Sequence, residues 1–156
     1  MPVQTVEIGL SWFEHGRGLS VPRTQSAGAA GVDLMAAISE NEPIVLPPGQ
    51  RALIPCGFAM ALPDGYEAQV RPRSGLAIRH GITVLNAPGT IDADYRGEVQ
   101  VILINFGQDD FSIRRGDRVA QMVVAPFMCS DFILRDNLND TERGKKGFGS
   151  TGHKTS

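Results

Sequence analysis

Short apolar or alternating runs, separated by glycine and proline, fill the chain from residue 3 to residue 132. Runs of this length that end in turn residues are typical of strands, so the pattern predicts an all-β barrel or sandwich. The clearest strands are residues 98–105 and 118–125, whose β-branched content favours strand over helix. Both are expected in the core. The turn signals stand at Pro47-Pro48-Gly49, Pro63-Asp64-Gly65, Pro88-Gly89 and Arg115-Gly116-Asp117.

One short helix is expected at Ser74–His80, where Ser74 can cap the start and Gly81 can end it in a left-handed conformation. The polar, glycine-rich residues 143–156 cannot bury enough apolar area to order themselves. We therefore predict a single domain, residues 1–142, and a flexible C-terminal segment, residues 143–156, which a ligand would order.

The composition and net charge limit the kinds of ligand that the chain is expected to bind. The chain has 156 residues, 42% of them hydrophobic, which suffices for one packed core. A net charge of -2 offers no bulk attraction to nucleic acid or to an anionic membrane, so a small ligand is expected. The two cysteines, Cys56 and Cys129, show no zinc or disulfide spacing. With no apolar run of roughly 18 residues and no secretion signal, the expected location is the cytoplasm.

Arg73, Ser74 and Gly75 stand together at the expected helix start. Exposed backbone N–H groups and a guanidinium suit phosphate oxygens, although a capped turn explains the same residues equally well. Further along, Gln121 is an amide inside an apolar strand, and a ligand oxygen is one candidate for its partner. For Asp117 and Arg118, the pairing of Asp117 with a neighbouring arginine is the simpler explanation.

Two carboxylates, Asp92 and Asp94, precede Tyr95 in a short glycine-bounded segment. Such a cluster is commonly a solvated hairpin turn. Alternatively, the rigid Pro88-Gly89 corner holds Asp92 in a fixed, partly shielded position, where its carboxylate can orient and deprotonate water. Tyr95 is either a half-buried core residue or a flat ring that packs against a sugar.

Residues 147–155 resemble a phosphate-binding P-loop, but one residue too many separates the second glycine from the lysine. The sequence also leaves no room for the helix that follows a P-loop, so a P-loop enzyme is excluded. What remains is Phe148 near Arg143, Lys145 and Lys146, either a solubilising tail or a lid over a base and a polyphosphate. The three histidines show no metal-ligand spacing, so a zinc site held by the protein is not expected.

Five segments, taken in order, resemble the motifs of the trimeric dUTPase family, and they span nearly the whole chain. They are AGVDLMA at 30–36, PRSGLA at 72–77, NAPGTIDADYRGEV at 86–99, GDRVAQ at 116–121 and RGKKGFGSTG at 143–152. The resemblance implies a jelly-roll-like β-barrel that forms a homotrimer with shared active sites. It also implies hydrolysis of dUTP to dUMP and pyrophosphate with Mg²⁺, which keeps uracil out of DNA and supplies dUMP for dTMP synthesis.

By the same resemblance, Asp92 is the catalytic residue that activates the water attacking the α-phosphorus, and Tyr95 lies beneath deoxyribose and leaves no room for a 2′-hydroxyl. Asn86, backbone at Gly89 and Gln100 would recognise uracil. Mg²⁺ would be held by the triphosphate and water, with Asp33 reaching its hydration shell. The remaining substrate-binding residues implied are Arg73, Ser74, Gly75, Thr90, Ile91, Gln121, Arg143, Phe148, Gly149, Ser150 and Thr151.

Two positions depart from the family pattern: Lys146 replaces a common glycine, and Cys56 stands where threonine is frequent. Lys146 affects the path of the closed tail and adds a possible phosphate contact. Two other functions fit parts of the sequence: a dCTP deaminase, which resembles this family in its barrel and phosphate sites, and a non-catalytic trimer that binds nucleotide or protein. The ADYRG sequence and the aromatic tail favour the pyrophosphatase.

Overall fold

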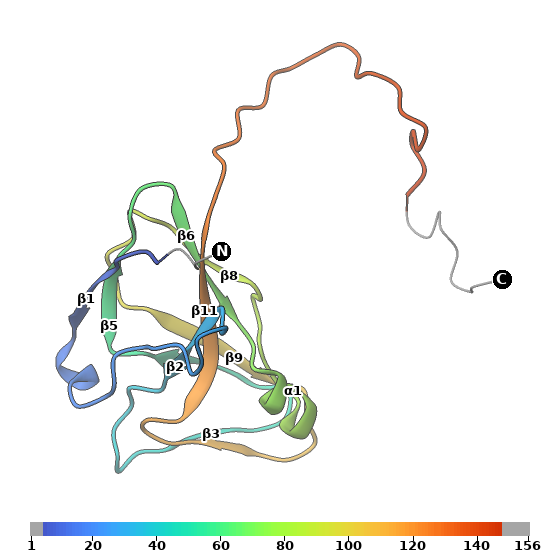
Figure 1. Ribbon diagram of the computed structural model, residues 1–156. Helices are drawn as coiled ribbons and strands as arrows, with labels where there is room; N and C mark the ends of the chain where they lie inside the picture. Colours follow the sequence, from blue (N-terminus) through green and yellow to red (C-terminus); the bar gives the residue numbers. More distant parts are fainter. Residues whose placement is uncertain (1–4, 148–156) are drawn as a thin grey trace.

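The computed structural model describes residues 5–147 as a mostly β protein with one short α-helix (Figure 1). This confirms the predicted fold class. None of the described helices is long and apolar enough to cross a membrane. The elements are β1 (Gly9–Trp12), the 3-10 helix η1 (Glu14–Gly16), β2 (Gly31–Met35), β3 (Ile44–Leu46), β4 (Arg51–Pro55), β5 (Phe58–Ala61), β6 (Tyr66–Arg71), α1 (Ser74–His80), β7 (Ile82–Val84), β8 (Gly89–Ile91), β9 (Gln100–Asn105), β10 (Phe111–Ile113) and β11 (Arg118–Pro126).

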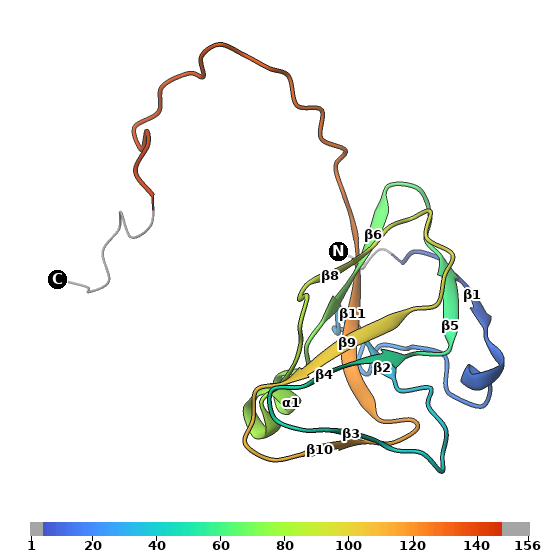
Figure 2. The same ribbon diagram turned by 180° about the vertical axis from the view of Figure 1, so that it is seen from behind.

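The two strands expected in the core are the central strands of the two larger sheets. Strand β11 lies between β2 and β6 in the order β2-β11-β6-β8, and β9 lies between β4 and β7 (Figures 1 and 2). The pairs β1-β5 and β10-β3 complete the fold, and every pairing is antiparallel. The prediction was right for both strands, although β9 starts two residues later than expected, at Gln100.

A single hydrophobic cluster joins the sheets. Val101 and Leu103 of β9 and Val119 and Met122 of β11 are all buried in it. Asn105 at the end of β9 is also fully buried, and its amide donates to the backbone oxygens of Leu46 and Asp109 at 2.8 Å. A buried amide with its partners supplied is stable, so this end of the barrel is closed by hydrogen bonds as well as by apolar contact.

Helix α1 has the predicted bounds, and Gly81 ends it at φ +67°, the left-handed conformation that glycine adopts without strain. The predicted role of Ser74 as the cap is wrong. Arg73 occupies the capping position in extended conformation, and no side chain makes a cap hydrogen bond. Ser74 is therefore the first helical residue, with its side chain exposed.

After Pro126 the chain leaves the barrel, and residues 127–147 contain no helix or strand (Figure 1). Phe132 and Leu134 in this stretch are 94% and 97% exposed. Ile133 between them is 68% exposed, so three consecutive large apolar side chains of this stretch are not covered by its own barrel. The division into residues 1–142 and 143–156 stays a prediction.

Candidate functional site

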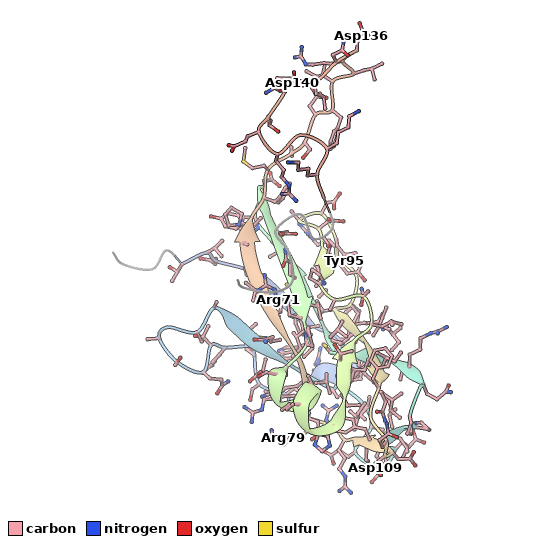
Figure 3. All side chains as sticks on the ribbon, turned by 90° about the vertical axis from the view of Figure 1, so that its right-hand side faces the viewer. Arg71, Arg79, Tyr95, Asp109, Asp136 and Asp140 are labelled. Atoms are coloured by element: carbon pink, nitrogen blue, oxygen red, sulfur yellow. The ribbon has the colours of Figure 1, made fainter. Side chains whose placement is uncertain are left out.

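A polar cavity of about 530 Å³ lies at the start of α1, and we call it the arginine pocket. Ser74 and Gly75 line it from α1, Asp33 from β2 and Gln121 from β11. Figure 3 shows Arg71 and Arg79 on the side of the barrel that carries α1. The guanidinium groups that line the pocket are those of Arg71, Arg73, Arg79 and Arg118.

Asp33 is the acidic residue of this lining, and it holds two of the arginines in place. Its carboxylate lies 3.1 Å from Nε of Arg73 and 3.4 Å from Nη1 of Arg118, and its side chain is only 13% exposed. Arg73 also donates to the backbone oxygen of Arg118 at 3.0 Å. Four guanidinium groups against one carboxylate leave an excess of positive charge, which suits a polyphosphate.

Gln121 is half-buried, and its Nε2 donates to the backbone oxygen of Pro72 at 3.0 Å. Its Oε1 lies only 2.8 Å from where a Cβ of Gly31 would fall, so the small residue at position 31 leaves room for the amide. The amide therefore has a backbone partner, and it remains part of the arginine pocket.

The expected pairing of Asp117 with a neighbouring arginine is wrong. Arg118 does pair, with Asp33. Asp117 instead accepts the backbone N–H of Arg114 at 2.8 Å, which stabilises the tight turn, and it makes no ion pair in the part of the chain that is described.

A second cavity, of about 250 Å³, lies along the segment from β8 to β9, and we call it the hairpin pocket. Gly89 is buried in β8 opposite Val70, with the amide nitrogen of Asn86 3.2 Å from where its Cβ would fall. The structure thus brings the residues predicted to bind the nucleoside, and the predicted catalytic residue, around one cavity. The predicted residues that line this cavity are Asn86, Thr90, Ile91, Asp92, Tyr95 and Gln100.

Asp92 was expected to be partly shielded, and in this structure it is exposed. Its backbone oxygen accepts the N–H of Tyr95 at 3.2 Å, so the turn is fixed while the carboxylate faces the cavity lining and solvent. The rigid corner before β8 therefore places the carboxylate without covering it. Any shielding has to come from outside the described part of one chain.

Tyr95 is 45% exposed and is neither part of the hydrophobic core cluster nor packed against it, so it is not a core residue. Its hydroxyl donates to the backbone oxygen of Glu98 at 3.0 Å. Its ring lies so close to Gly97 that a Cβ there would overlap the ring. The ring is thus fixed at its far end, and it lines the same cavity as Asp92. Glu98, which also lines the hairpin pocket, was missed by the sequence analysis.

The two pockets share no lining residue. Arg143 lines neither of them, and its Nε donates to the backbone oxygen of Lys146. The predicted site residues Phe148, Gly149, Ser150 and Thr151 lie outside the described residues. The chain therefore presents the predicted groups in two separate pockets.

Residues 5–147 contain no group of three or more His, Cys, Asp or Glu side chains placed to hold a metal ion. Asp33, the predicted indirect contact to Mg²⁺, is already paired with two arginines. The donor set therefore does not fit a metal held by protein ligands alone. It leaves room for a metal that enters with a bound polyphosphate.

Cys56 is buried beside the hairpin pocket. Burial, and secondly the charge of Glu98, raises the pKa of its thiol from 9.0 to about 12. Because the thiolate is the reactive form, this thiol is chemically inert at ordinary pH. Cysteine at this position therefore serves as a small core residue.

Comparisons with known proteins agree on one family. The dUTPase family model matches residues 18–152. A deoxyuridine 5′-triphosphate nucleotidohydrolase from Beijerinckia indica is 61% identical over 97% of this chain and 95% of its own length. A Staphylococcus bacteriophage 80alpha dUTPase bound to dUpNHpp superposes with a TM-score of 0.82, at 22% identity, over 96% of this chain and all of that one.

A further solved structure, a dUTPase from phage phi11 of S. aureus, superposes with a TM-score of 0.73 at 21% identity, covering 85% of this chain and 98% of that one. It is described with a structural Mg(II) ion. At these identities the two phage structures confirm the fold.

Proposed function

The chain belongs to the dUTPase family and hydrolyses deoxyuridine 5′-triphosphate, and we propose that water attacks the α-phosphorus in line, with Asp92 as the base, to give dUMP and pyrophosphate. This reaction removes a nucleotide that would place uracil in DNA, and it supplies dUMP for dTMP synthesis. The 61% identity to a nucleotidohydrolase along nearly the whole chain disfavours both a dCTP deaminase and a non-catalytic trimer.

The observation that carries the proposal is the gathering of Asp92, Tyr95 and Asn86 around one cavity. A carboxylate beside a flat, anchored ring suits a nucleoside whose sugar lies on the ring. Asp92 then holds the 3′-hydroxyl and takes a proton from the attacking water. Tyr95, fixed by its hydroxyl, excludes a 2′-hydroxyl by steric contact.

Uracil recognition is assigned to the strand edges of the same cavity. Asn86, the backbone of Gly89 and Gln100 supply donors and acceptors in the pattern of a base pair, and Thr90 and Ile91 line the cavity beside them. Cytosine presents the reversed pattern, which would leave polar groups unpaired, and the methyl group of thymine would collide.

The triphosphate is assigned to the arginine pocket. Arg73, Ser74, Gly75 and Gln121 would contact the phosphate oxygens, with Ser74 near the bond that breaks. The hydroxyl of Ser74 is available for this role because it does not cap the helix. The fixed guanidinium groups stabilise the negative charge that builds on pyrophosphate as it leaves.

Magnesium is proposed to enter with the nucleotide, as part of the substrate, because the described residues supply no cluster of ligands. When bound, it neutralises phosphate charge. Asp33 is the carboxylate that would face its hydration shell, at the edge of the arginine pocket. The two arginines on Asp33 hold that carboxylate in one orientation.

A homotrimer with shared sites explains why the arginine pocket and the hairpin pocket are separate. Each pocket would be a half-site that a neighbouring subunit completes. The two pockets have no residue in common, and Asp92 is exposed on one chain. The exposed apolar residues after Pro126 are a second reason to expect contact with another subunit. In the assembled site, Arg143 would bind the terminal phosphate, Phe148 would cover uracil, and Gly149, Ser150 and Thr151 would lie near the phosphates.

Nucleotide-selective release of pyrophosphate tests the proposed reaction. Purified protein is incubated separately with dUTP, dCTP, dTTP and UTP, with Mg²⁺ and with a chelator. We expect pyrophosphate from dUTP alone, with a strong dependence on Mg²⁺. Release from dCTP but not from dUTP would contradict the proposal, as would equal rates for all four nucleotides.

A further inference from the structure

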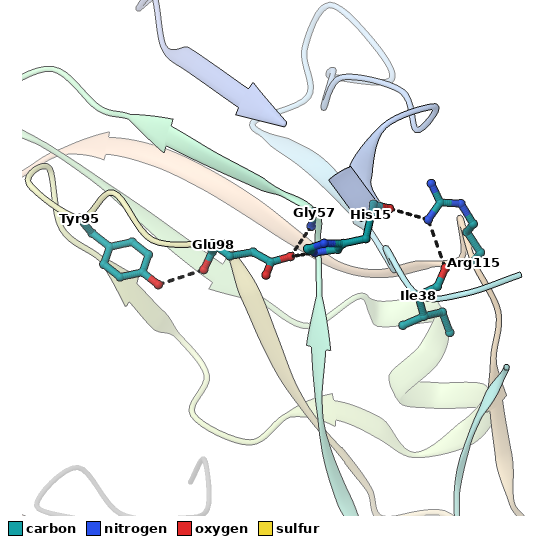
Figure 4. Close-up of polar contacts among 6 residues, drawn as sticks. All are labelled: His15, Ile38, Gly57, Tyr95, Glu98 and Arg115. Carbon is teal, nitrogen blue, oxygen red and sulfur yellow. Dashed lines mark hydrogen bonds and ion pairs between the residues drawn. The ribbon is translucent and has the colours of Figure 1, made fainter. Parts of the chain in front are cut away.

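Glu98 lies where the hairpin pocket meets loops from distant parts of the chain. Its side chain is 18% exposed and lines the hairpin pocket. Its backbone oxygen accepts the hydroxyl of Tyr95 at 3.0 Å. Its carboxylate accepts the backbone N–H of Gly57 at 2.9 Å, and Nε2 of His15 lies 2.5 Å from the same oxygen (Figure 4). One residue thus joins the anchored ring to two remote loops.

The two loops are rigidly packed against each other. Gly16 and Gly57 approach so closely that a Cβ on either would overlap the backbone of the other. Gly57 adopts φ +78°, and its carbonyl accepts the N–H of Phe13 at 2.8 Å. The backbone N–H of Gly57, which donates a hydrogen bond to Glu98, is therefore held in one position by its surroundings.

His15 is held in place from its other side by Arg115. The guanidinium of Arg115 donates to the backbone oxygens of His15 at 2.6 Å, Arg17 at 2.8 Å and Ile38 at 3.1 Å. Figure 4 shows the resulting line of polar contacts from Tyr95 through Glu98 and His15 to Arg115. The carboxylate of Glu98 is thus bound to a fixed support.

By contrast, the segment that carries Tyr95 has little regular structure of its own. Residues 92–99 belong to no strand, and the N–H of Tyr95 bonds back to Asp92 across a turn. The next backbone contact is at Val99, whose N–H donates to the backbone oxygen of Phe58 at 2.9 Å, and strand pairing begins at Gln100. The position of the ring therefore depends on where Glu98 is held.

From this geometry we infer that Glu98 and His15 are positioning residues for Tyr95. The carboxylate of Glu98 fixes its own backbone oxygen, and that oxygen fixes the tyrosine hydroxyl and so the wall against which the sugar lies. The inference rests on the proposed role of Tyr95 in excluding a 2′-hydroxyl. Hydrogen bonds to a carboxylate are among the stronger ones in proteins, so losing them should let the ring move.

Discrimination between dUTP and UTP is the readout, because a purely structural role would lower both rates equally. The ratio of kcat/KM for dUTP to that for UTP is measured for Glu98→Ala, Glu98→Gln and His15→Ala. We expect Glu98→Ala to lower the ratio about tenfold or more. Glu98→Gln should stay near the wild-type ratio, because its Oε1 can still accept from Gly57. His15→Ala should show a smaller fall in the same direction.

Glu14→Ala is the matched control, because it removes an exposed carboxylate next to His15. Among the described residues, that carboxylate forms an ion pair with Arg17 alone. A folded Glu98→Ala variant with the wild-type ratio would overturn the inference, and so would Glu98→Gln falling as far as Glu98→Ala. If Glu98→Ala does not fold, an unchanged ratio in His15→Ala overturns it instead. Failure of the unmodified protein to hydrolyse dUTP would contradict the proposed function, a distinct outcome.

Discussion

At the scale of single residues, the proposed chemistry depends on Asp92. It lies in the hairpin pocket next to Tyr95, which is anchored to Glu98. Two residues further on, Asp94 is also exposed but does not line the pocket. The structure therefore separates two carboxylates that the sequence presents as a pair, and it assigns the cavity to one of them.

Replacing Asp92 by Asn should leave dUTP binding close to wild type while lowering kcat roughly 10²- to 10⁴-fold, as expected for loss of a general base. Asp94→Asn is the matched control and should keep its turnover. Binding is measured by titration calorimetry and turnover by pyrophosphate release. Unchanged turnover in the Asp92 variant would remove Asp92 from this role.

Cys56 gives a prediction about pH. Its thiol is 2% exposed, with a pKa of about 12 against an ordinary 9.0. In the unfolded chain the thiol releases its proton above about pH 9, whereas in the fold it keeps it, so this contribution to stability is lost as pH rises from 9 to 12. In a Cys129→Ser background, iodoacetamide at pH 8 should label the protein only after denaturant is added. Rapid labelling of the folded protein would show that the thiol is accessible and ionised.

At the scale of elements, the sequence predicted those parts whose signals are local. Helix α1 was predicted to the residue, because Gly81 marks its end, and the long strands β9 and β11 were recognised from their β-branched runs. Strands of three residues such as β7 and β10 are too short to show a period. Ser74 was misread as a cap because either of two adjacent residues can take that position.

The role of Glu98 could not be predicted for a different reason. Its partners His15 and Gly57 are 83 and 41 positions away, and only the folded barrel brings them together. A carboxylate just before an apolar strand was the one local signal. Asp92 and Tyr95 were found because the family motif contains them, while the sequence reasoning alone left a solvated turn as an equal alternative.

The C-terminal segment yields a prediction at the same scale. Deleting residues 143–156 should lower kcat by roughly 100-fold or more, because closure over the nucleotide positions the reacting groups. The barrel should stay folded, since its last strand ends at Pro126. Turnover, circular dichroism and the melting temperature check both statements. Wild-type turnover, or a chain that no longer folds, would contradict the assignment of this segment as a lid.

At the scale of the whole molecule, the central claim is that one chain carries two half-sites which act with those of its neighbours. Residues of β2, β6, α1 and β11 line the arginine pocket, whereas residues of β4, β8, β9 and the segment between β8 and β9 line the hairpin pocket. Each lacks what the other has: one has no candidate base, and the other has no group of cations. A trimer with a threefold axis repeats the same contact and gives three composite sites.

Mixing two variants, each impaired in a different pocket, tests this claim most directly. Ser74→Ala impairs the arginine pocket and Asp92→Asn the hairpin pocket, and neither side chain supports the fold by a hydrogen bond within the described residues. The two proteins are unfolded, mixed in equal amounts and refolded together, with separately refolded samples as the control. Random trimers with sites shared between neighbours should recover about a quarter of wild-type activity. Activity no higher than the average of the separate samples would show that both half-sites must come from the same chain, and would contradict the account.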